Sequence, residues 1–166
     1  MSKRTDRLDI PATIQWEGKG NRKHVLKHLI EKNNFKEMAE VGVRDGRTTF
    51  FLLDHIPDLI IYAIDMSIKG FYNSEIKKKY GERLRPIEAK SDVAADSFQD
   101  GSLDLVFIDA NHSYEYVKND IIKYTPKLKS TGLLTGHDID YPGVNKAVNE
   151  MIKEYEVAPN FVWIKK

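Results

Sequence analysis

The stretch M-A-E-V-G-V-R-D-G, Met38 to Gly46, decides the fold of this chain. Its apolar beginning is typical of a short buried strand, and the glycines at 42 and 46 allow a tight turn that a ligand can approach closely. Arg47 to Ile56 follows as a predicted helix. The first N–H groups of a helix are unpaired and carry its positive dipole end, so they would face a ligand in the turn. The stretch therefore predicts a strand, a ligand-binding turn and a helix.

A second acidic position favours a nucleotide as the ligand. Asp65 ends the apolar run Leu59 to Ile64, about twenty residues beyond the turn, where a carboxylate can accept both hydroxyls of a ribose. Dinucleotide-binding turns need G-x-G-x-x-G, whereas this turn reads E-x-G-x-x-x-G. A glycine turn also occurs in α/β domains that bind no ligand there. The interpretation therefore depends on residues later in the chain.

The remaining sequence alternates between helical and extended patterns. Further helices are predicted over 21–33, over 68–80 with Gly81 as the residue after the helix end, from the turn at 90–92 to 98, from 113 up to Pro126, and over 144–155. Further strands are predicted over 59–65, 84–89, 103–109, 133–138 and 161–164, with a short one near 156–158. Residues 1–20 are expected to be an N-terminal tail and residues 21–166 a single domain. The alternation predicts a three-layer α/β/α sandwich on a Rossmann-like, mostly parallel sheet of about seven strands.

The composition excludes several functional classes. The chain has 166 residues, which fits one domain, and its 26 Lys and Arg residues nearly balance its 25 Asp and Glu residues. A balanced charge provides no basic face for nucleic acid. Without cysteine, no disulfide, thiolate metal site or thiolate nucleophile forms. The N-terminal residues lack the apolar segment of a signal peptide, and no run reaches the length of a membrane span. A soluble, cytoplasmic protein with no nucleic-acid or membrane partner is therefore expected.

Polar side chains gather where the predicted strands end. In an open parallel sheet, ligands bind beyond the carboxyl ends of the strands. These positions hold Arg44 and Asp45 after the first strand, Asp65 after the second, Ser91 and Asp92 after the third, Asp109, Asn111 and His112 after the fourth, and His137, Asp138 and Asp140 after the fifth. A carboxylate at or near the end of every one of these strands is more than solubility requires. The functional site is therefore expected at this edge.

Three segments resemble one protein family. The turn E-x-G-x-x-x-G resembles motif I of the class I S-adenosylmethionine-dependent methyltransferases. Residues 107–120, F-I-D-A-N-H-S-Y-E-Y-V-K-N-D, and residues 132–150, G-L-L-T-G-H-D-I-D-Y-P-G-V-N-K-A-V-N-E, resemble the D-x-x-H-x-Y…D and G-H-D…G-V-x-x-A-V elements of the macrocin-type, small-molecule O-methyltransferases of that superfamily. The likeness covers roughly residues 37–155, and the order, spacing and strand-end positions of the elements agree.

The resemblance implies a cofactor site for S-adenosylmethionine at the glycine turn. Asp65 would accept the ribose hydroxyls, and Met66 would lie against the adenine. Ser91 and Asp92 would face the polar edge of the adenine. Glu40, Gly42 and Gly46 would cradle the methionine end, and Val43 and Arg44 of the same turn would also bind the cofactor.

The resemblance also implies a catalytic site after the fourth and fifth strands. Asp109 would contact the cofactor and, with Asp138, hold a divalent cation such as Mg²⁺, and His112 would be the general base. The chemistry agrees with these roles. A hydroxyl is a poor nucleophile near neutral pH, so methyl transfer to oxygen benefits from a cation that lowers the hydroxyl pKa and from a base that takes the proton.

Departures from the family pattern leave alternatives open. Relatives of the catechol type carry asparagine after the second metal aspartate, whereas this chain has Ile139, so the third protein ligand is His137, Asp140 or water. In the alternative without a metal, the aspartates bind cofactor or cap helices, and His112 bonds a backbone carbonyl at a helix N-terminus. The chain also lacks an obvious lid. Acceptor recognition would then come from the N-terminal tail, the strand-end loops or a second subunit of a homo-oligomer.

The leading hypothesis is therefore a methyltransferase that acts on a hydroxyl of a small molecule, such as a sugar or a natural product. A nicotinamide-dependent oxidoreductase fits less well, because the third glycine of its turn is missing. A non-catalytic cofactor-binding domain with a regulatory or assembly role is the third hypothesis.

Overall fold

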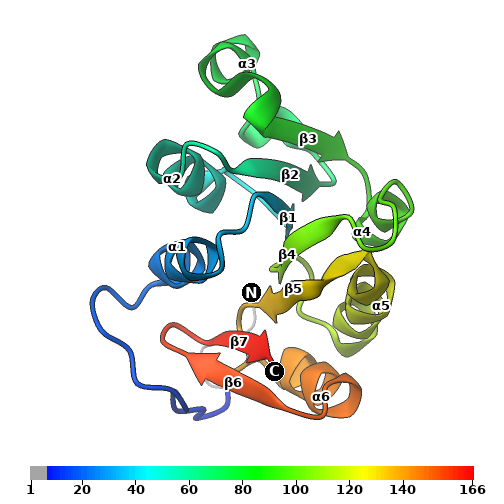
Figure 1. The fold of residues 1–166 in the computed structure, drawn as a ribbon. Coiled ribbons are helices and arrows are strands. Elements are labelled where there is room, and N and C mark those ends of the chain that lie inside the picture. Colours follow the sequence, from blue (N-terminus) through cyan, green and yellow to red (C-terminus); the bar gives the residue numbers. More distant parts are fainter. Residues whose placement is uncertain (1–6) are drawn as a thin grey trace.

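The computed structural model describes residues 7–166 and shows a seven-stranded sheet between two layers of helices (Figure 1). The strands lie in the order β3-β2-β1-β4-β5-β7-β6. Neighbours from β3 to β5 are parallel, and β7 runs antiparallel to both β5 and β6. The predicted Rossmann-like α/β sandwich is confirmed. The strands are Glu37–Val41 (β1), Ile60–Asp65 (β2), Leu84–Glu88 (β3), Leu103–Ile108 (β4), Leu128–Gly136 (β5), Tyr155–Ala158 (β6) and Val162–Lys165 (β7).

Each face of the sheet is covered by helices whose apolar side chains form a separate core (Figure 1). One layer contains α1 (Arg22–Asn33), α2 (Arg47–His55) and α3 (Ser74–Tyr80), and the other contains α4 (Ser91–Ala95), α5 (Tyr114–Tyr124) and α6 (Pro142–Met151). Every residue of β4 is buried, as expected of a central parallel strand that is covered on both faces. Because β1 and β4 are parallel neighbours in the middle of the sheet, their carboxyl ends lie side by side.

The helix predicted over 68–80 is interrupted. Ile68–Gly70 is a short 3₁₀ turn, and α3 begins only at Ser74. The side chain of Asn73 accepts hydrogen bonds from the N–H groups of Glu75 and Ile76, both at 3.0 Å. An asparagine that caps a helix in this way holds an extended backbone, so it starts a new helix and does not continue an old one. Gly81 follows α3 with φ +55°, as predicted for the residue after the helix end.

Three other boundaries differ from the prediction. β5 spans Leu128–Gly136 and so begins five residues before the predicted 133, and its pairing with β4 includes an irregularity between Leu103 and Leu105. The short helix α4 ends at Ala95 and not at Phe98. The apolar stripe expected to continue to Tyr155 is divided, because Ile152 has an extended backbone with φ −122° and Tyr155 starts β6.

Residues 7–20 contain neither helix nor strand and lie along β6. Thr13 donates its N–H to the carbonyl of Val157 in β6 at 2.8 Å. Closer to the N-terminus, Leu8 donates its N–H to the carbonyl of Asp140, in the loop after β5, at 2.7 Å. The expected N-terminal tail is therefore placed for residues 7–20, and the part of that prediction on residues 1–6 lies outside the described residues.

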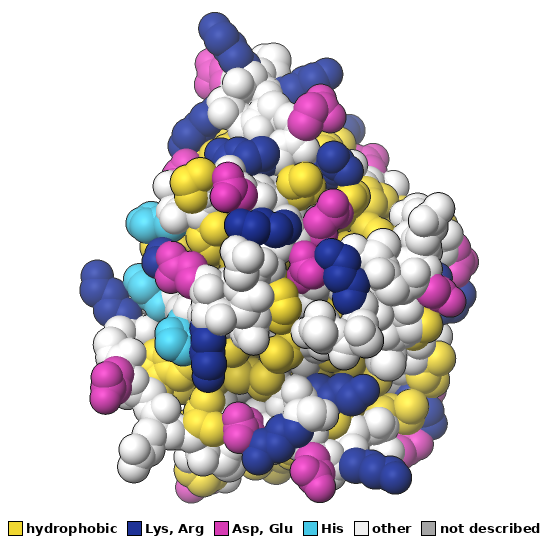
Figure 2. Space-filling view, viewed as in Figure 1, with side chains coloured by type: hydrophobic (Ala, Val, Ile, Leu, Met, Phe, Trp, Pro, Cys, Tyr) yellow, Lys and Arg dark blue, Asp and Glu magenta, His cyan; other side chains and the backbone are white. Residues whose placement is uncertain are grey.

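The surface agrees with the balanced charge of the sequence. On the face drawn in Figure 2, basic and acidic side chains are interspersed. None of the helices within residues 7–166 combines the length and apolar character that a membrane crossing requires.

The side chain of Asp104, near the amino-terminal ends of β4 and β1, should contribute measurably to stability. Its Oδ2 accepts the N–H groups of Lys36 and Glu37, both at 2.9 Å, and its Oδ1 accepts Lys129 Nζ at 2.9 Å. Asp104→Ala leaves two amides without their acceptor and should lower the free energy of unfolding by about 2–4 kcal/mol. Asp104→Asn keeps one oxygen and should cost about 1 kcal/mol. Denaturant unfolding measures both changes, and equal losses would contradict this assignment.

A side chain at Gly42 should also destabilise the protein, because the turn after β1 contacts the residues that follow β4. A Cβ at Gly42 would lie 2.3 Å from the Asp109 carbonyl oxygen, and φ at Gly42 is +92°. Gly101 also has positive φ, +69°, but a Cβ there would meet open space. Gly101→Ala should therefore cost about 1 kcal/mol of unfolding free energy, which is the backbone cost alone, and Gly42→Ala at least twice as much. Parallel thermal denaturation of the two variants tests the difference.

Candidate functional site

A pocket of about 790 Å³ opens at the carboxyl ends of the central strands. This is the edge where the polar strand ends were expected to gather. Among the residues expected to be functional, those that line the pocket are Glu40, Gly42, Val43, Arg44, Asp65, Met66, Ser91, Asp92, Asp109, His112 and Asp138. Gly46 lies outside the lining and is the N-cap residue before α2, with φ +78°, and His137 is buried next to Asp109 and Asp138. The structure therefore brings two groups of side chains into one cavity.

The first group surrounds the glycine turn. One oxygen of Asp65 accepts the N–H groups of Val43 and Arg44, at 3.0 and 2.8 Å, and the other accepts the Ser67 N–H at 3.2 Å. Arg44 has φ +60°, a strained value for a residue with a side chain. Asp65 thus holds the turn in its tight conformation in addition to lining the pocket.

Glu40 lies under this turn and is almost completely buried. Its carboxyl group accepts a hydrogen bond from the Thr49 hydroxyl of α2 at 2.5 Å. Burial raises the pKa of Glu40 to about 8, although the bond from Thr49 opposes the shift. The side chain is therefore in its neutral form over much of the neutral range, in a pocket wall that already contains several carboxylates.

Next to this first group, the pocket is lined by Met66, Ser91 and Asp92. Met66 is 72% exposed, which is unusual for a large apolar side chain and leaves its surface free for a flat ligand. Ser91 starts α4, and its carbonyl accepts the Tyr124 hydroxyl at 2.8 Å. Beneath it, Asp120 of α5 is 1% exposed, and neither carboxyl oxygen has a hydrogen-bond partner among the described residues. Burial raises the pKa of Asp120 to about 6.

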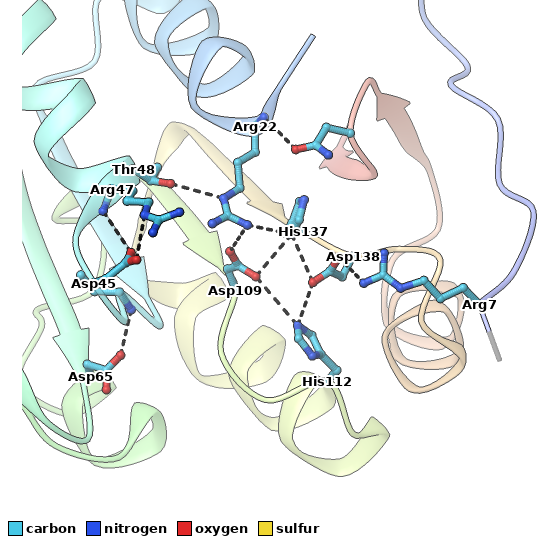
Figure 3. Close-up of polar contacts among 12 residues, drawn as sticks. Arg7, Arg22, Asp45, Arg47, Thr48, Asp65, Asp109, His112, His137 and Asp138 are labelled. Carbon is cyan, nitrogen blue, oxygen red and sulfur yellow. Dashed lines mark hydrogen bonds and ion pairs between the residues drawn. The ribbon is translucent and has the colours of Figure 1, made fainter. Parts of the chain in front are cut away.

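The second group is a cluster of carboxylates and imidazoles after β4 and β5 (Figure 3). Asp138 Oδ2 lies 2.9 Å from His112 Nε2 and 3.2 Å from His137 Nδ1. Asp109 Oδ1 lies 3.5 Å from His137 Nδ1 and 3.9 Å from His112 Nε2. Both aspartates therefore direct one oxygen toward the same two imidazoles. Asp138 has φ +55°, so its placement depends on a strained backbone.

The proximity of these charges changes their protonation. The carboxylates of Asp109 and Asp138 raise the pKa of His112 to about 9. Burial alone would lower the pKa of His137, but the same two carboxylates raise it to about 9. Burial alone would raise the pKa of Asp109 and of Asp138, yet the imidazoles hold both pKa values below the usual range of an aspartate. Each imidazole therefore favours its protonated form and each carboxylate its ionised form when they face one another.

The same donor set fits a divalent cation. Asp109, His137 and Asp138 each offer one ligand atom, and these atoms lie within 4.8 Å of one another. Two carboxylates suit a hard cation, and one imidazole is compatible with Mn²⁺ or a softer metal. Among the alternatives for a third ligand, His137 has the required position. Asp140 instead pairs with Arg7 at 3.0 Å, and Ile139 is fully buried in the core.

Sequence reasoning missed several residues that the fold brings to the site. Arg22, the first residue of α1, lies 3.4 Å from Asp109 Oδ2 and 3.3 Å from the Thr48 hydroxyl. Arg7, from the N-terminal segment, pairs with Asp138 at 3.1 Å. Tyr116 lines the pocket and is 57% exposed. Neither arginine lies in or near a sequence motif, so no local signal connects Arg7 or Arg22 to the cluster. In the sequence, Tyr116 occurs only within the quoted stretch 107–120, where nothing indicated that it faces the pocket.

Comparisons with known proteins agree with this geometry. Residues 39–139 match a family model described as a methyltransferase domain, while a search of curated proteins found no match. The solved structure of an SAH-bound methyltransferase from Podospora anserina is similar, with a TM-score of 0.69 and 15% identity over 87% of this chain and 77% of that chain. A Staphylococcus aureus protein, provisionally named a caffeoyl-CoA O-methyltransferase, has a TM-score of 0.67 and 19% identity over 93% and 86% of the two chains.

A third solved structure is that of a TDP-rhamnose 3'-O-methyltransferase of calicheamicin biosynthesis, with a TM-score of 0.63 and 15% identity over 86% of this chain and 77% of that chain. At such identities these structures establish the shared fold. The family model carries more weight, because it matches well over half of the sequence, from β1 to the loop after β5, and includes both groups of pocket residues. The chain belongs to the methyltransferase domain family.

Proposed function

We propose that this protein is an S-adenosylmethionine-dependent methyltransferase of the macrocin type that transfers a methyl group to a hydroxyl of a small molecule, such as a sugar or a natural product. The observation that carries the proposal is one pocket with two chemically different ends. The glycine turn and Asp65 lie at one end, and the carboxylate–imidazole cluster lies at the other. A methyl group can pass directly between ligands held at these two ends.

The first end suits the cofactor. S-Adenosylmethionine carries a positively charged sulfonium and ammonium group, and the pocket lining includes the carboxylates of Asp45, Asp65 and Asp109. The turn exposes backbone close to the ligand because Gly42 has no side chain. Met66 offers a free apolar surface to the adenine. The SAH bound in the Podospora anserina structure supports this cofactor, since that protein shares the fold.

The second end suits an acceptor hydroxyl. The oxygen attacks the methyl carbon, the carbon–sulfur bond breaks, and the cofactor leaves as S-adenosylhomocysteine while the hydroxyl proton passes to His112. A divalent cation on Asp109, His137 and Asp138 would lower the pKa of that hydroxyl. The names of two structural neighbours, an O-methyltransferase of caffeoyl-CoA and one of TDP-rhamnose, support oxygen as the acceptor atom.

Binding experiments test the cofactor end. Asp65→Ala should weaken binding of S-adenosylmethionine by about 1.5–3 kcal/mol, because a charge-assisted acceptor for the ribose is lost and the turn loses two of its hydrogen bonds. Asp58→Ala, which removes an exposed carboxylate paired with Lys36, is the matched control. Calorimetry with S-adenosylmethionine, S-adenosylhomocysteine and NAD measures the effect. Tighter binding of NAD would favour the oxidoreductase, and cofactor binding with no acceptor turned over would favour a non-catalytic domain.

Turnover tests the role of His112. His112→Ala should lower the turnover number by roughly 10² to 10⁴ and leave cofactor affinity nearly unchanged, because a base acts on the acceptor proton. Without a divalent cation, the carboxylates hold His112 protonated from its ordinary pKa of 6.5 up to about 9, so the rate of the wild type measured without added cation should rise with pH through this window. The variant should lose that rise. His55→Ala is the control. If His112→Ala loses cofactor binding or stability instead, the imidazole is structural.

A further inference from the structure

The N-terminal segment from Arg7 to Trp16, here called the strap, is held firmly against the domain. Besides the bond from Thr13 N–H to Val157, the Val157 N–H donates to Thr13 Oγ1 at 2.8 Å. β6 is the last strand of the sheet, so the strap covers a sheet edge that would otherwise be open. Ile14 and Trp16 pack on the apolar cluster formed by α1, β6 and β7, and Ile10 packs on the core under α6. These contacts determine where the strap ends.

The strap ends at the loop that carries the cluster. The Arg7 guanidinium forks between two carboxylates. Its NH2 lies 3.1 Å from Asp138 Oδ1 (Figure 3), and its NH1 lies 3.0 Å from Asp140 Oδ2. Its carbon also lies 4.0 Å above the centre of the Tyr141 ring, and that ring stacks on His112 at 4.4 Å and 13°. Arg7 therefore contacts Asp138 directly and His112 through Tyr141.

The two oxygens of Asp138 have different partners. Arg7 holds Oδ1, while Oδ2 faces the two imidazoles and the pocket. Arg22 holds Asp109 in the same manner, since it lies at Oδ2 and leaves Oδ1 directed toward His137. Each carboxylate thus has one oxygen held by a guanidinium and the other directed toward the imidazoles. Groups that orient ligands from the second layer in this way strengthen metal binding by about 10- to 100-fold in known sites.

Arg7 also compensates a second charge. The Asp140 side chain is 2% exposed, and Arg7 is its cationic partner in the structure. A buried carboxylate without such a partner is unfavourable. The fork consequently connects the strap to the backbone of the loop from Asp138 to Tyr141, in which Asp138 has its strained φ.

We propose that Arg7 is a positioning residue of the methyltransferase site, which sets the Asp138 carboxylate for a divalent cation and holds Tyr141 against His112. This inference rests on the proposed function. It assigns the N-terminal segment to the active site, although more than a hundred residues separate Arg7 from Asp138. An arginine in this place has two opposite effects on a cation, because its charge repels the metal while its fork orients the ligand. The proposal states that orientation dominates.

The test is Mn²⁺ binding to the full chain, measured by electron paramagnetic resonance without acceptor, with S-adenosylhomocysteine affinity measured in parallel by calorimetry. Arg7→Met should weaken Mn²⁺ binding at least about tenfold and change S-adenosylhomocysteine affinity by less than about threefold. Arg7→Lys should resemble Arg7→Met more than the wild type, because an ammonium cannot fork between two carboxylates. Lys123→Met removes an equal charge from a surface pair on α5 and should leave both affinities unchanged.

Each other result overturns the proposal. Unchanged or tighter Mn²⁺ binding by Arg7→Met means that the arginine only competes with the cation, and full recovery in Arg7→Lys means that charge alone matters. A wild type that binds S-adenosylhomocysteine but no Mn²⁺ removes this inference and leaves the cofactor site intact, whereas a wild type that binds neither removes the proposed function as well. If Arg7→Met unfolds, Arg7→Met/Asp140→Asn removes the uncompensated carboxylate, and the same Mn²⁺ measurement then decides.

Discussion

The parallel pairing of β1 with β4 is the constraint on which the site depends. It places the turn after Val41 so close to Asp109 that a Cβ at Gly42 would overlap the Asp109 carbonyl. A ligand bound at the turn and a ligand bound at the acidic cluster would therefore meet over this contact. Because both strands are parallel and central, helices bury them on both faces and leave their carboxyl ends as the accessible edge.

The need to compensate buried charge explains why the carboxylates after β4 and β5 lie among imidazoles and guanidinium groups. Asp109, Asp138 and Asp140 are buried or nearly so, and carboxylates in that position need cationic partners or a metal. The structure supplies two arginines and two imidazoles, each from a different segment of the chain. A divalent cation at the same inner oxygens would take the place of the imidazolium protons, and its binding would release protons.

The local motifs were the predictable part of the site. Glycine with positive φ after a buried strand, an acid at the end of the next strand and the D-x-x-H segment all depend on backbone close in sequence, so the pattern itself indicates their positions. The fold class followed from alternation for the same reason. The broken helix before Asn73 was not predictable from periodicity, since a side chain that caps a helix competes with a pattern that would continue it.

The sequence by itself determined the α/β architecture, the glycine turn with Asp65, and the strand ends that carry Asp109, His112, His137 and Asp138. The position of His137 beside Asp109 and Asp138, where Asp140 does not lie, follows from the tertiary structure alone, as do the ion pairs that Arg7 and Arg22 form with these two carboxylates. The reason is physical. Strand and turn patterns record interactions between near neighbours in the chain, whereas the partner of a buried charge is set by distance in space, and 131 residues separate Arg7 from Asp138.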